Sequence, residues 1–337
     1  MSIKRPFAWE TVTNGYRGGL FCGRRGVGGL AGKKVALWGE GASGRVFSLA
    51  AVCRGICDEL LVTGCDLRQA EKRVSALRRA SEVEDGCVAI SVSDDGGIAD
   101  ADLVILTSGS LEREKSLYGT ELRRCLRELE SAVDRICQSG FDGIFLVATR
   151  RTELTTEIVR RRSGFDASAV LGTGTVTETL RMRRALADRF GLSPKEIQAY
   201  VIGDREGEAF VPWSQVYAAS RSVAAVCKGD AALCGGMRQL EESVVGTALS
   251  EDLSQSAADG LALIKTVKAI LGDEKRALTV AACPEGAYGE SGVCLSLPCV
   301  LGKKGVEKVL TLDLSGRELD RLSSVCDRLR SLRREMT

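Results

Sequence analysis

The sequence contains no histidine among its 337 residues. This absence removes the side chain that most often titrates near neutral pH, so any acid–base step would depend on a carboxylate, Lys, Cys or Tyr. An excess of charge of either sign is missing too, because 47 Lys and Arg residues stand against 45 Asp and Glu residues. Bulk electrostatics therefore give no reason to expect a nucleic-acid partner or binding to an anionic membrane.

Long apolar runs are also missing from the N-terminal stretch. Residues 1–32 carry scattered charges and no apolar run of the length needed for a signal peptide or a membrane span. We therefore expect a cytoplasmic protein. Residues 1–31 contain seven glycines and are interpreted as a flexible extension.

The thirteen cysteines are spread from Cys22 to Cys326 without a repeated CxxC spacing, and their number is odd. We do not expect disulfides or a metal site from this distribution. Cys53 and Cys57 lie four residues apart on a predicted helix, which fits either a metal or redox pair or two small buried side chains. The second interpretation is favoured, because free cysteine is among the most buried residue types.

Short runs rich in Val, Ile and Leu alternate with longer amphipathic stretches in the first half of the chain. This alternation is typical of βαβ units and predicts an α/β fold with a doubly wound parallel sheet of Rossmann type. The predicted strands are 34–38, 59–63, 87–91, 102–107 and 143–148, with a helix at 120–139.

The pattern changes after residue 172, where we predict a mixed α+β region. The predicted elements are a helix at 178–190, a strand at 198–203, a helical block at 231–271, and β runs at 277–283, 292–301 and 306–312. A last helix begins at Ser315, which forms a capping box with Glu318. The expected domains are therefore 32–173, of dinucleotide-binding Rossmann type, and 174–337, a C-terminal α+β domain.

A glycine-rich turn joins the first predicted strand to a helix. Gly39, Gly41 and Gly44 form a GxGxxG pattern, in which the glycines permit a tight turn, approach of a pyrophosphate to the backbone and close helix packing. The start of the helix would then face the anion. We interpret these residues as a candidate cofactor site for NAD or NADP, with weak binding.

The ribose end of that site departs from the expected pattern. An NAD site has a carboxylate about 20 residues beyond the glycines, but Gly64 stands there and Asp66 is the nearest candidate. Gly64 with Arg68 would suit a 2′-phosphate, so NADP is an alternative. Arg68 as a solvated helix charge is the simpler interpretation.

Four segments, 101–109, 170–176, 200–203 and 305–310, follow one another in an order that resembles the L-lactate/malate dehydrogenase superfamily. Their sequences are ADLVILTSG, VLGTGTV, YVIG and GVEKVL. The resemblance extends from about residue 33 to about residue 333. It implies an NAD-binding Rossmann domain, a mixed α+β substrate domain and assembly into dimers or tetramers.

The resemblance also assigns the catalytic positions. In the family a histidine follows the YVIG strand and one acidic residue, and it carries the proton during hydride transfer; Arg205 stands in its place. A guanidinium stays protonated, so Arg205 can bind an anion but cannot cycle as an acid and base. Glu178 matches the carboxylate that orients the histidine, and Arg181 matches the arginine that holds the substrate carboxylate. Arg150 replaces an asparagine.

Plain structural roles remain open for these residues. Arg181 fits an ion pair between domains as well as an anion site, and Arg205 with Glu178 fits an ordinary salt bridge, which we favour. Glu206 or Asp204 would substitute for the histidine if burial raised the carboxyl pKa, although we expect both at the surface.

Two further positions depart from the family pattern. The substrate loop, 110–118, has Tyr118 in place of its arginine, with Arg113 as an alternative, and Gln255 replaces a small hydroxyl residue.

We therefore interpret the chain as a non-catalytic member of the family, a pseudoenzyme. Arg150, Arg181 and Arg205 would bind a small anionic ligand, and the chain would act in nucleotide or anion binding, or in assembly with a protein partner. The alternative is an NAD(P)-dependent L-2-hydroxyacid dehydrogenase with a rearranged active site.

Overall fold

The computed structural model describes residues 32–39, 41–64, 66–93, 95–108, 111, 119–229, 235–246 and 253–336. The expected extension 1–31, Glu40 of the glycine turn, and the expected substrate loop apart from Leu111 lie outside the described residues.

The N-terminal part of the fold is a parallel sheet in the order β3-β2-β1-β4-β5-β6. Its strands are β1 (Lys34–Trp38), β2 (Glu59–Thr63), β3 (Ala89–Val92), β4 (Leu103–Leu106), β5 (Ile144–Val147) and β6 (Val170–Gly172). The doubly wound α/β prediction is confirmed. Two of the strands begin and end at the residues predicted from the sequence, because buried parallel strands are continuous apolar runs with sharp polar ends.

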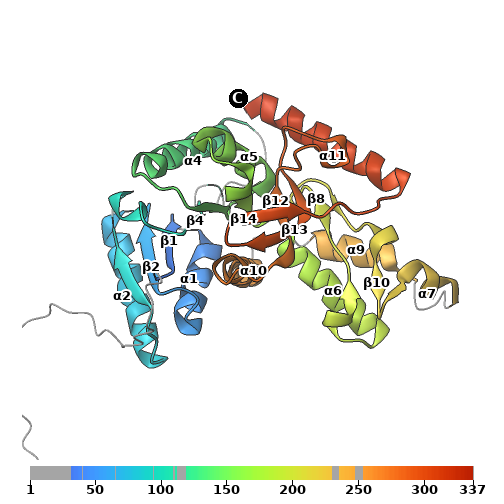
Figure 1. Cartoon of the computed structure of the whole chain (residues 1–337), viewed down its shortest axis with the longest axis horizontal. Helices are drawn as coiled ribbons and strands as arrows, with labels where there is room; N and C mark the ends of the chain where they lie inside the picture. The colour runs from blue at the N-terminus through green and yellow to red at the C-terminus, as the bar shows by residue number, and fades with distance from the viewer. Residues whose placement is uncertain are drawn as a thin grey trace, which may run out of the picture. The chain divides into compact units, whose positions relative to one another are not determined.

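Helices cover both faces of this sheet (Figure 1). Val35 and Leu37 of β1 face one core, where they pack with α1 (Ala42–Arg54), α2 (Leu67–Val83) and α10 (Leu253–Leu271). Ala36 and Trp38 face the other core, with α4 (Thr120–Gln138) and α5 (Thr152–Ser163). The twofold side-chain alternation of a strand therefore divides β1 between two apolar layers.

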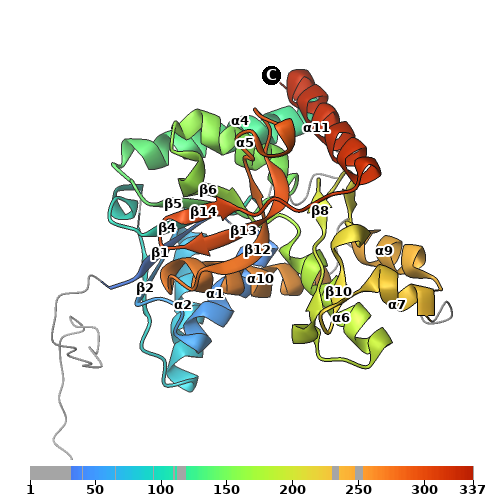
Figure 2. The ribbon, with the colours of Figure 1, turned by 45° about the vertical axis from the view of Figure 1, so that its right-hand side comes forward.

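An antiparallel part continues the same sheet beyond β6 (Figure 2). Its strands are β12 (Arg276–Ala282), β13 (Leu295–Gly302), β14 (Gly305–Val309), β8 (Ile202–Gly203) and β9 (Ala209–Phe210). Gly172 of β6 pairs with Ala281 of β12, so the sheet crosses the expected domain boundary. The division at 173/174 stays a prediction from the sequence.

The predicted strand 198–203 is wrong in part. β7 (Ile197–Gln198) belongs to a small separate sheet with β10 (Tyr217–Ala218) and β11 (Arg221–Ser222), whereas β8 joins the main sheet. Between β7 and β8, hydroxyl groups replace a neighbouring strand: Thr175 Oγ1 donates to the Val201 carbonyl at 2.5 Å, and the Val201 amide donates to Thr179 Oγ1 at 2.9 Å. An apolar run cannot reveal such side-chain partners.

The C-terminal helices follow the expected pattern except for α7, which was not predicted. They are α6 (Val176–Phe190), α7 (Val223–Gly229), α9 (Met237–Val245), α10 and α11 (Gly316–Met336). The predicted helical block at 231–271 therefore contains α9 and α10, and residues 230–234 and 247–252 lie outside the described part. The capping box is confirmed, since the amide of Ser315 donates to Glu318 Oε2 at 2.8 Å. Short 3-10 turns lie at Asp95–Ile98, Ala167–Ala169, Pro194–Glu196, Trp213–Gln215 and Ala287–Gly289.

The expectation of no disulfides is wrong. Cys283 and Cys294 are bonded, with their Cα atoms 4.2 Å apart. Cys283 follows β12 and Cys294 precedes β13, and the antiparallel pairing of these strands brings the two ends together. Cys53 and Cys57 are both free thiols, but only Cys57 is buried.

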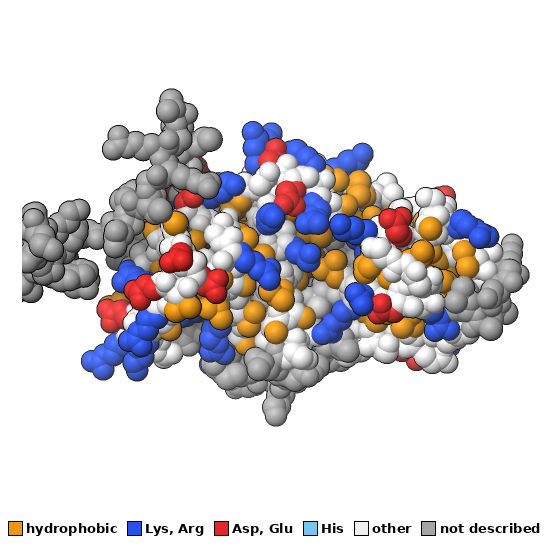
Figure 3. All heavy atoms as spheres, turned by 90° about the horizontal axis from the view of Figure 1, so that it is seen from below, with side chains coloured by type: hydrophobic (Ala, Val, Ile, Leu, Met, Phe, Trp, Pro, Cys, Tyr) orange, Lys and Arg blue, Asp and Glu red, His pale blue; other side chains and the backbone are white. Residues whose placement is uncertain are grey.

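The described surface carries charges of both signs. On the face in Figure 3, basic and acidic side chains are interspersed with apolar patches. Within the described ranges, no helix has the length and apolar character needed to cross a membrane.

Candidate active site

The glycine turn lies between β1 and α1, as predicted. Gly39 has φ +94°, and a Cβ there would collide with the carbonyl oxygen of Thr107. At Gly44 a Cβ would lie 2.8 Å from Thr107 Cγ2. The Thr107 hydroxyl accepts a hydrogen bond from the Gly41 amide at 3.2 Å and donates to the Trp38 carbonyl at 2.9 Å. This close packing of the turn against the end of β4 fits the cradle of a dinucleotide.

The end of β2 has no room for a carboxylate side chain. Gly64 has φ +71°, and a Cβ there would lie 2.5 Å from the indole ring of Trp38. Asp66, the predicted substitute, is the N-cap of α2: its Oδ1 accepts hydrogen bonds from the amides of Arg68 at 3.0 Å and Gln69 at 3.3 Å. Binding of a cofactor by Asp66 stays a prediction.

We expect the Gly64→Ala variant to be less stable than the Gly55→Ala variant by about 1–3 kcal/mol, the usual range for overpacking. Both glycines have a left-handed φ, but a Cβ at Gly55 would meet nothing within 4 Å. The comparison therefore isolates the collision with Trp38. Urea unfolding followed by circular dichroism measures the difference, and equal losses in the two variants would contradict it.

Arg205 is the centre of a buried ion-pair network. Its Nε donates to Glu178 Oε1 at 3.0 Å, and its Nη2 donates to Asp259 Oδ1 and Oδ2 at 2.8 and 2.9 Å. Glu178 comes from the first turn of α6, Asp259 from α10, and Arg205 from the turn after β8. The structure therefore contains the expected salt bridge, together with a second carboxylate that sequence reasoning missed.

The network continues through neutral side chains to Arg181. Asp259 Oδ1 also accepts hydrogen bonds from Thr177 Oγ1 at 2.7 Å and from Gln255 Nε2 at 3.1 Å, and Arg181 Nη1 donates to Gln255 Oε1 at 2.8 Å. Two guanidinium groups and two carboxylates are thus joined without a net charge. Arg181 is only half-buried, so it forms the accessible end of the network.

A second cluster surrounds the turn after Asp204. Arg150 Nε donates to Glu206 Oε2 at 3.2 Å, the Arg151 amide donates to Glu206 Oε1 at 3.0 Å, and Arg151 Nη1 lies 3.9 Å from Asp204 Oδ2. The expectation of surface carboxylates is wrong, since Asp204 is 2% and Glu206 8% exposed. The turn 204–207 folds against the start of α5, a long-range contact that local composition does not encode.

In the two clusters together, two of the three arginines predicted to bind an anion form ion pairs with carboxylates. Arg150 pairs with Glu206, and Arg205 pairs with Glu178 and Asp259. Their charges are therefore largely compensated within the protein. Binding of a small anion by Arg150, Arg181 and Arg205 stays a prediction.

Glu153, in the first turn of α5, was also missed from the sequence. It is buried, and Ser296 Oγ donates to its Oε1 at 2.5 Å. Burial, reinforced by the charge of Asp204, raises the pKa of Glu153 to about 8. Burial likewise raises the pKa of Asp204, against the opposing effect of Arg151. Glu153 Oε2 and Asp204 Oδ1 are buried without a hydrogen-bond partner among the described residues.

Glu178 has a similar environment. Burial raises the pKa of its carboxyl group, while the positive charge of Arg205 lowers it. Its Oε2 is buried without a hydrogen-bond partner in the described part of the chain. The same part contains no group of three or more Cys, Asp or Glu side chains placed to hold a metal ion.

Comparison with known proteins shows which families and relatives the chain is similar to. Residues 175–336 match the family described as lactate/malate dehydrogenase, alpha/beta C-terminal domain. An L-lactate dehydrogenase of Corynebacterium efficiens is 29% identical over 310 residues, covering 91% of this chain and 98% of the relative. An L-lactate dehydrogenase of Treponema denticola is 29% identical over 314 residues, covering 90% and 98%.

Solved structures show the same relationship. A lactate dehydrogenase enzyme from a Medee basin deep-sea metagenome library has a TM-score of 0.84 and 27% identity, covering 91% of this chain and 99% of that one. The fold is thus a Rossmann-type sheet followed by a dehydrogenase-type α+β region. Residues 175–336 thus match the lactate/malate dehydrogenase family, and most of the chain is similar to L-lactate dehydrogenases.

Proposed function

We propose that the chain is an NAD(P)-dependent L-2-hydroxyacid dehydrogenase with a rearranged active site. Its similarity to L-lactate dehydrogenases extends over nearly their full length. The observation that carries the proposal is the position of Arg181, which is half-buried at the accessible end of the network around Arg205. A guanidinium in this position can hold a substrate carboxylate through two parallel hydrogen bonds.

The proposed reaction converts a 2-hydroxy acid and the oxidised cofactor into a 2-keto acid, the reduced cofactor and a proton. The nicotinamide group, when bound, accepts the hydride from C2 of the substrate. Gly39, Gly41 and Gly44 fit its dinucleotide portion, because the turn packs so closely against Thr107 that side chains at Gly39 and Gly44 would collide with it. Arg181 orients the substrate. Arg205 stays protonated and only donates hydrogen bonds.

The proton of the substrate hydroxyl then needs another acceptor. Within the proposal, an ionised member of the buried carboxyl pair of Glu153 and Asp204 accepts this proton. Glu153, with a pKa of about 8, becomes ionised as the pH rises through that value and can then act as a base. Asp204 is the immediate neighbour of Arg205 in the chain, and the Arg205 backbone donates a hydrogen bond to Glu153, so the pair lies next to the position that the family resemblance assigns to the proton carrier.

A second candidate is a non-catalytic member of the superfamily. It is favoured by the burial of Arg205 between Glu178 and Asp259, at the position where the family resemblance places a histidine. Loss of acid–base participation alone reduces a rate by about 10² to 10⁴. Such a protein would act through nucleotide or anion binding, or through assembly with a partner or with further copies of the chain.

Turnover measured at the absorbance of the reduced nicotinamide distinguishes the two candidates. We expect oxidation of NADH or NADPH with pyruvate or oxaloacetate, and a loss of about 10- to 100-fold in kcat/KM in the Arg181→Ala variant, since charge-assisted hydrogen bonds to the substrate disappear. Arg184→Ala is the matched control, because Arg184 lies on the same helix and its exposed side chain pairs with the exposed Asp188. Nucleotide binding without turnover would instead support the non-catalytic candidate.

A further inference from the structure

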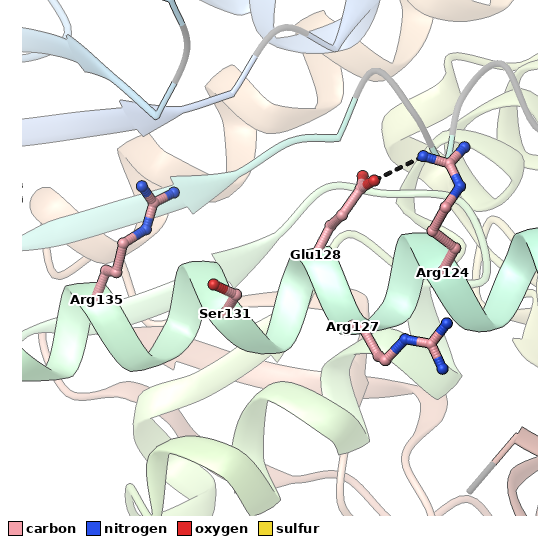
Figure 4. Close-up of a pocket in the computed structure, with 5 residues that line it drawn as sticks. All are labelled: Arg124, Arg127, Glu128, Ser131 and Arg135. Carbon is pink, nitrogen blue, oxygen red and sulfur yellow. Dashed lines mark hydrogen bonds and ion pairs between the residues drawn. The ribbon is translucent and has the colours of Figure 1, made fainter.

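An arginine-rich hollow lies along α4, outside the network around Arg205. It has a volume of about 470 Å³ and is lined by Arg124, Arg127, Glu128, Ser131 and Arg135. In Figure 4, Arg124, Glu128 and Arg135 project from one side of the helix and Arg127 from the other. Glu128 is the only carboxylate of the five and pairs with Arg124 at 2.8 Å. The lining therefore carries a net positive charge, which favours an anion.

Arg135, one of the lining residues, contacts the residue that precedes the glycine turn. The Arg135 guanidinium lies over the Trp38 ring, 4.8 Å from its centroid. Trp38 is the last residue of β1 and directly precedes Gly39, and its ring occupies the space beside Gly64. Arg135 thus lies near the place where the adenosine ribose is bound when a pyrophosphate lies on the turn.

Gly64, beside Trp38, offers no side-chain hydrogen-bond acceptor for the 2′-hydroxyl of an unmodified ribose. Position 64 cannot carry the carboxylate that would accept hydrogen bonds from a ribose 2′-hydroxyl, because the Trp38 ring fills its side-chain space. A second cation lies at the glycine turn itself, since Arg73 of α2 donates to the Gly39 carbonyl at 3.1 Å. A missing carboxylate, together with the Arg135 guanidinium against Trp38, favours a phosphate over a hydroxyl.

We propose that Arg135, held against Trp38, binds the 2′-phosphate of NADP(H), so that the chain prefers NADP(H) to NAD(H). The planar guanidinium keeps its orientation by stacking on the indole ring and presents its N–H groups to the phosphate oxygens. This inference rests on the dinucleotide site of the proposed function but not on turnover. It assigns the ribose end of the site to α4 rather than to Arg68.

Equilibrium titration of the whole chain tests the assignment without measuring activity. We expect NADPH to bind at least about tenfold more tightly than NADH, and 2′,5′-ADP more tightly than 5′-AMP by a similar factor, as charge-assisted hydrogen bonds to one phosphate require. The Arg135→Met variant keeps an aliphatic side chain over Trp38 and is expected to lose the preference while its affinity for NADH is unchanged. Arg238→Met removes one exposed charge far from α4 and serves as the control, with the preference retained.

The possible outcomes separate this inference from the proposed function. Equal or tighter binding of NADH, or an equal loss for both cofactors in Arg135→Met, would overturn the 2′-phosphate site and leave the dehydrogenase proposal standing. A preference for NADPH without turnover would support the site and contradict the dehydrogenase. Failure to bind either cofactor would overturn both.

Discussion

The Arg205→Ala variant is expected to lose about 3–5 kcal/mol of its free energy of unfolding, the usual cost of leaving buried charges without a partner. The substitution would leave Glu178 and Asp259 facing each other across an empty site, with Glu178 completely buried. Glu178 Oε2 already has no hydrogen-bond partner among the described residues, so this carboxylate depends on Arg205. Urea unfolding at neutral pH, followed by circular dichroism, measures the loss.

A matched triple variant separates the ion pairs from packing. Arg205→Met together with Glu178→Gln and Asp259→Asn removes the three charges while it keeps side chains of similar size. We expect this variant to be much closer to the wild type than Arg205→Ala, because replacing all partners of a buried ion pair is often nearly neutral. A loss below about 0.5 kcal/mol in Arg205→Ala, the range of ordinary surface substitutions, would show that the network is not buried in solution.

The stability of the protein is expected to fall as the pH rises from about 4.5 to about 8. The pKa of Glu153 is raised from 4.5 to about 8 in the fold, so in this interval the folded chain holds a proton that the unfolded chain has released. Its contribution is complete below pH 4.5 and is lost as the pH rises through about 8. The slope for one such proton is at most about 1.4 kcal/mol per pH unit. The raised pKa values of Asp204 and Glu178 act in the same direction.

Unfolding midpoints measured from pH 5 to pH 9 test this dependence. The Glu153→Gln variant, which keeps a similar shape without the titration, should have a flatter profile than the wild type. Glu196→Gln, at an exposed position, should leave the profile unchanged. Parallel profiles for the wild type and Glu153→Gln would show that Glu153 does not retain its proton on folding.

Much of the fold was predictable because it depends on local pattern. The buried strands β1 and β2 are short apolar runs in the sequence. The glycine turn and the Ser315 capping box each involve residues that are only a few positions apart. Each of these features is determined by the periodicity of side chains or by backbone conformation. The interrupted strand near Val201 was not predictable, because its hydrogen bonds are made with the hydroxyl groups of Thr175, the N-cap of α6, and Thr179, on α6.

The candidate site was predictable only in its residue types. The resemblance pointed to Arg205, Glu178 and Arg181, but Asp259 and Glu153 were missed because nothing in their neighbourhoods distinguishes them from surface carboxylates. Asp259 follows Gln255 by one turn of α10, and both reach the network only when that helix packs against α6. Burial of a carboxylate is a property of the surrounding fold, not of the residue.

The amino-acid sequence alone determined the α/β class, the position of the glycine turn and the absence of histidine. Tertiary structure decided which carboxylates neutralise which arginines, which acid retains a proton near neutral pH, and that the Trp38 ring fills the place of a ribose-binding carboxylate. The physical reason is that charge, pKa and available space depend on neighbours that are distant in the chain, whereas strand, turn and cap are encoded by residues a few positions apart.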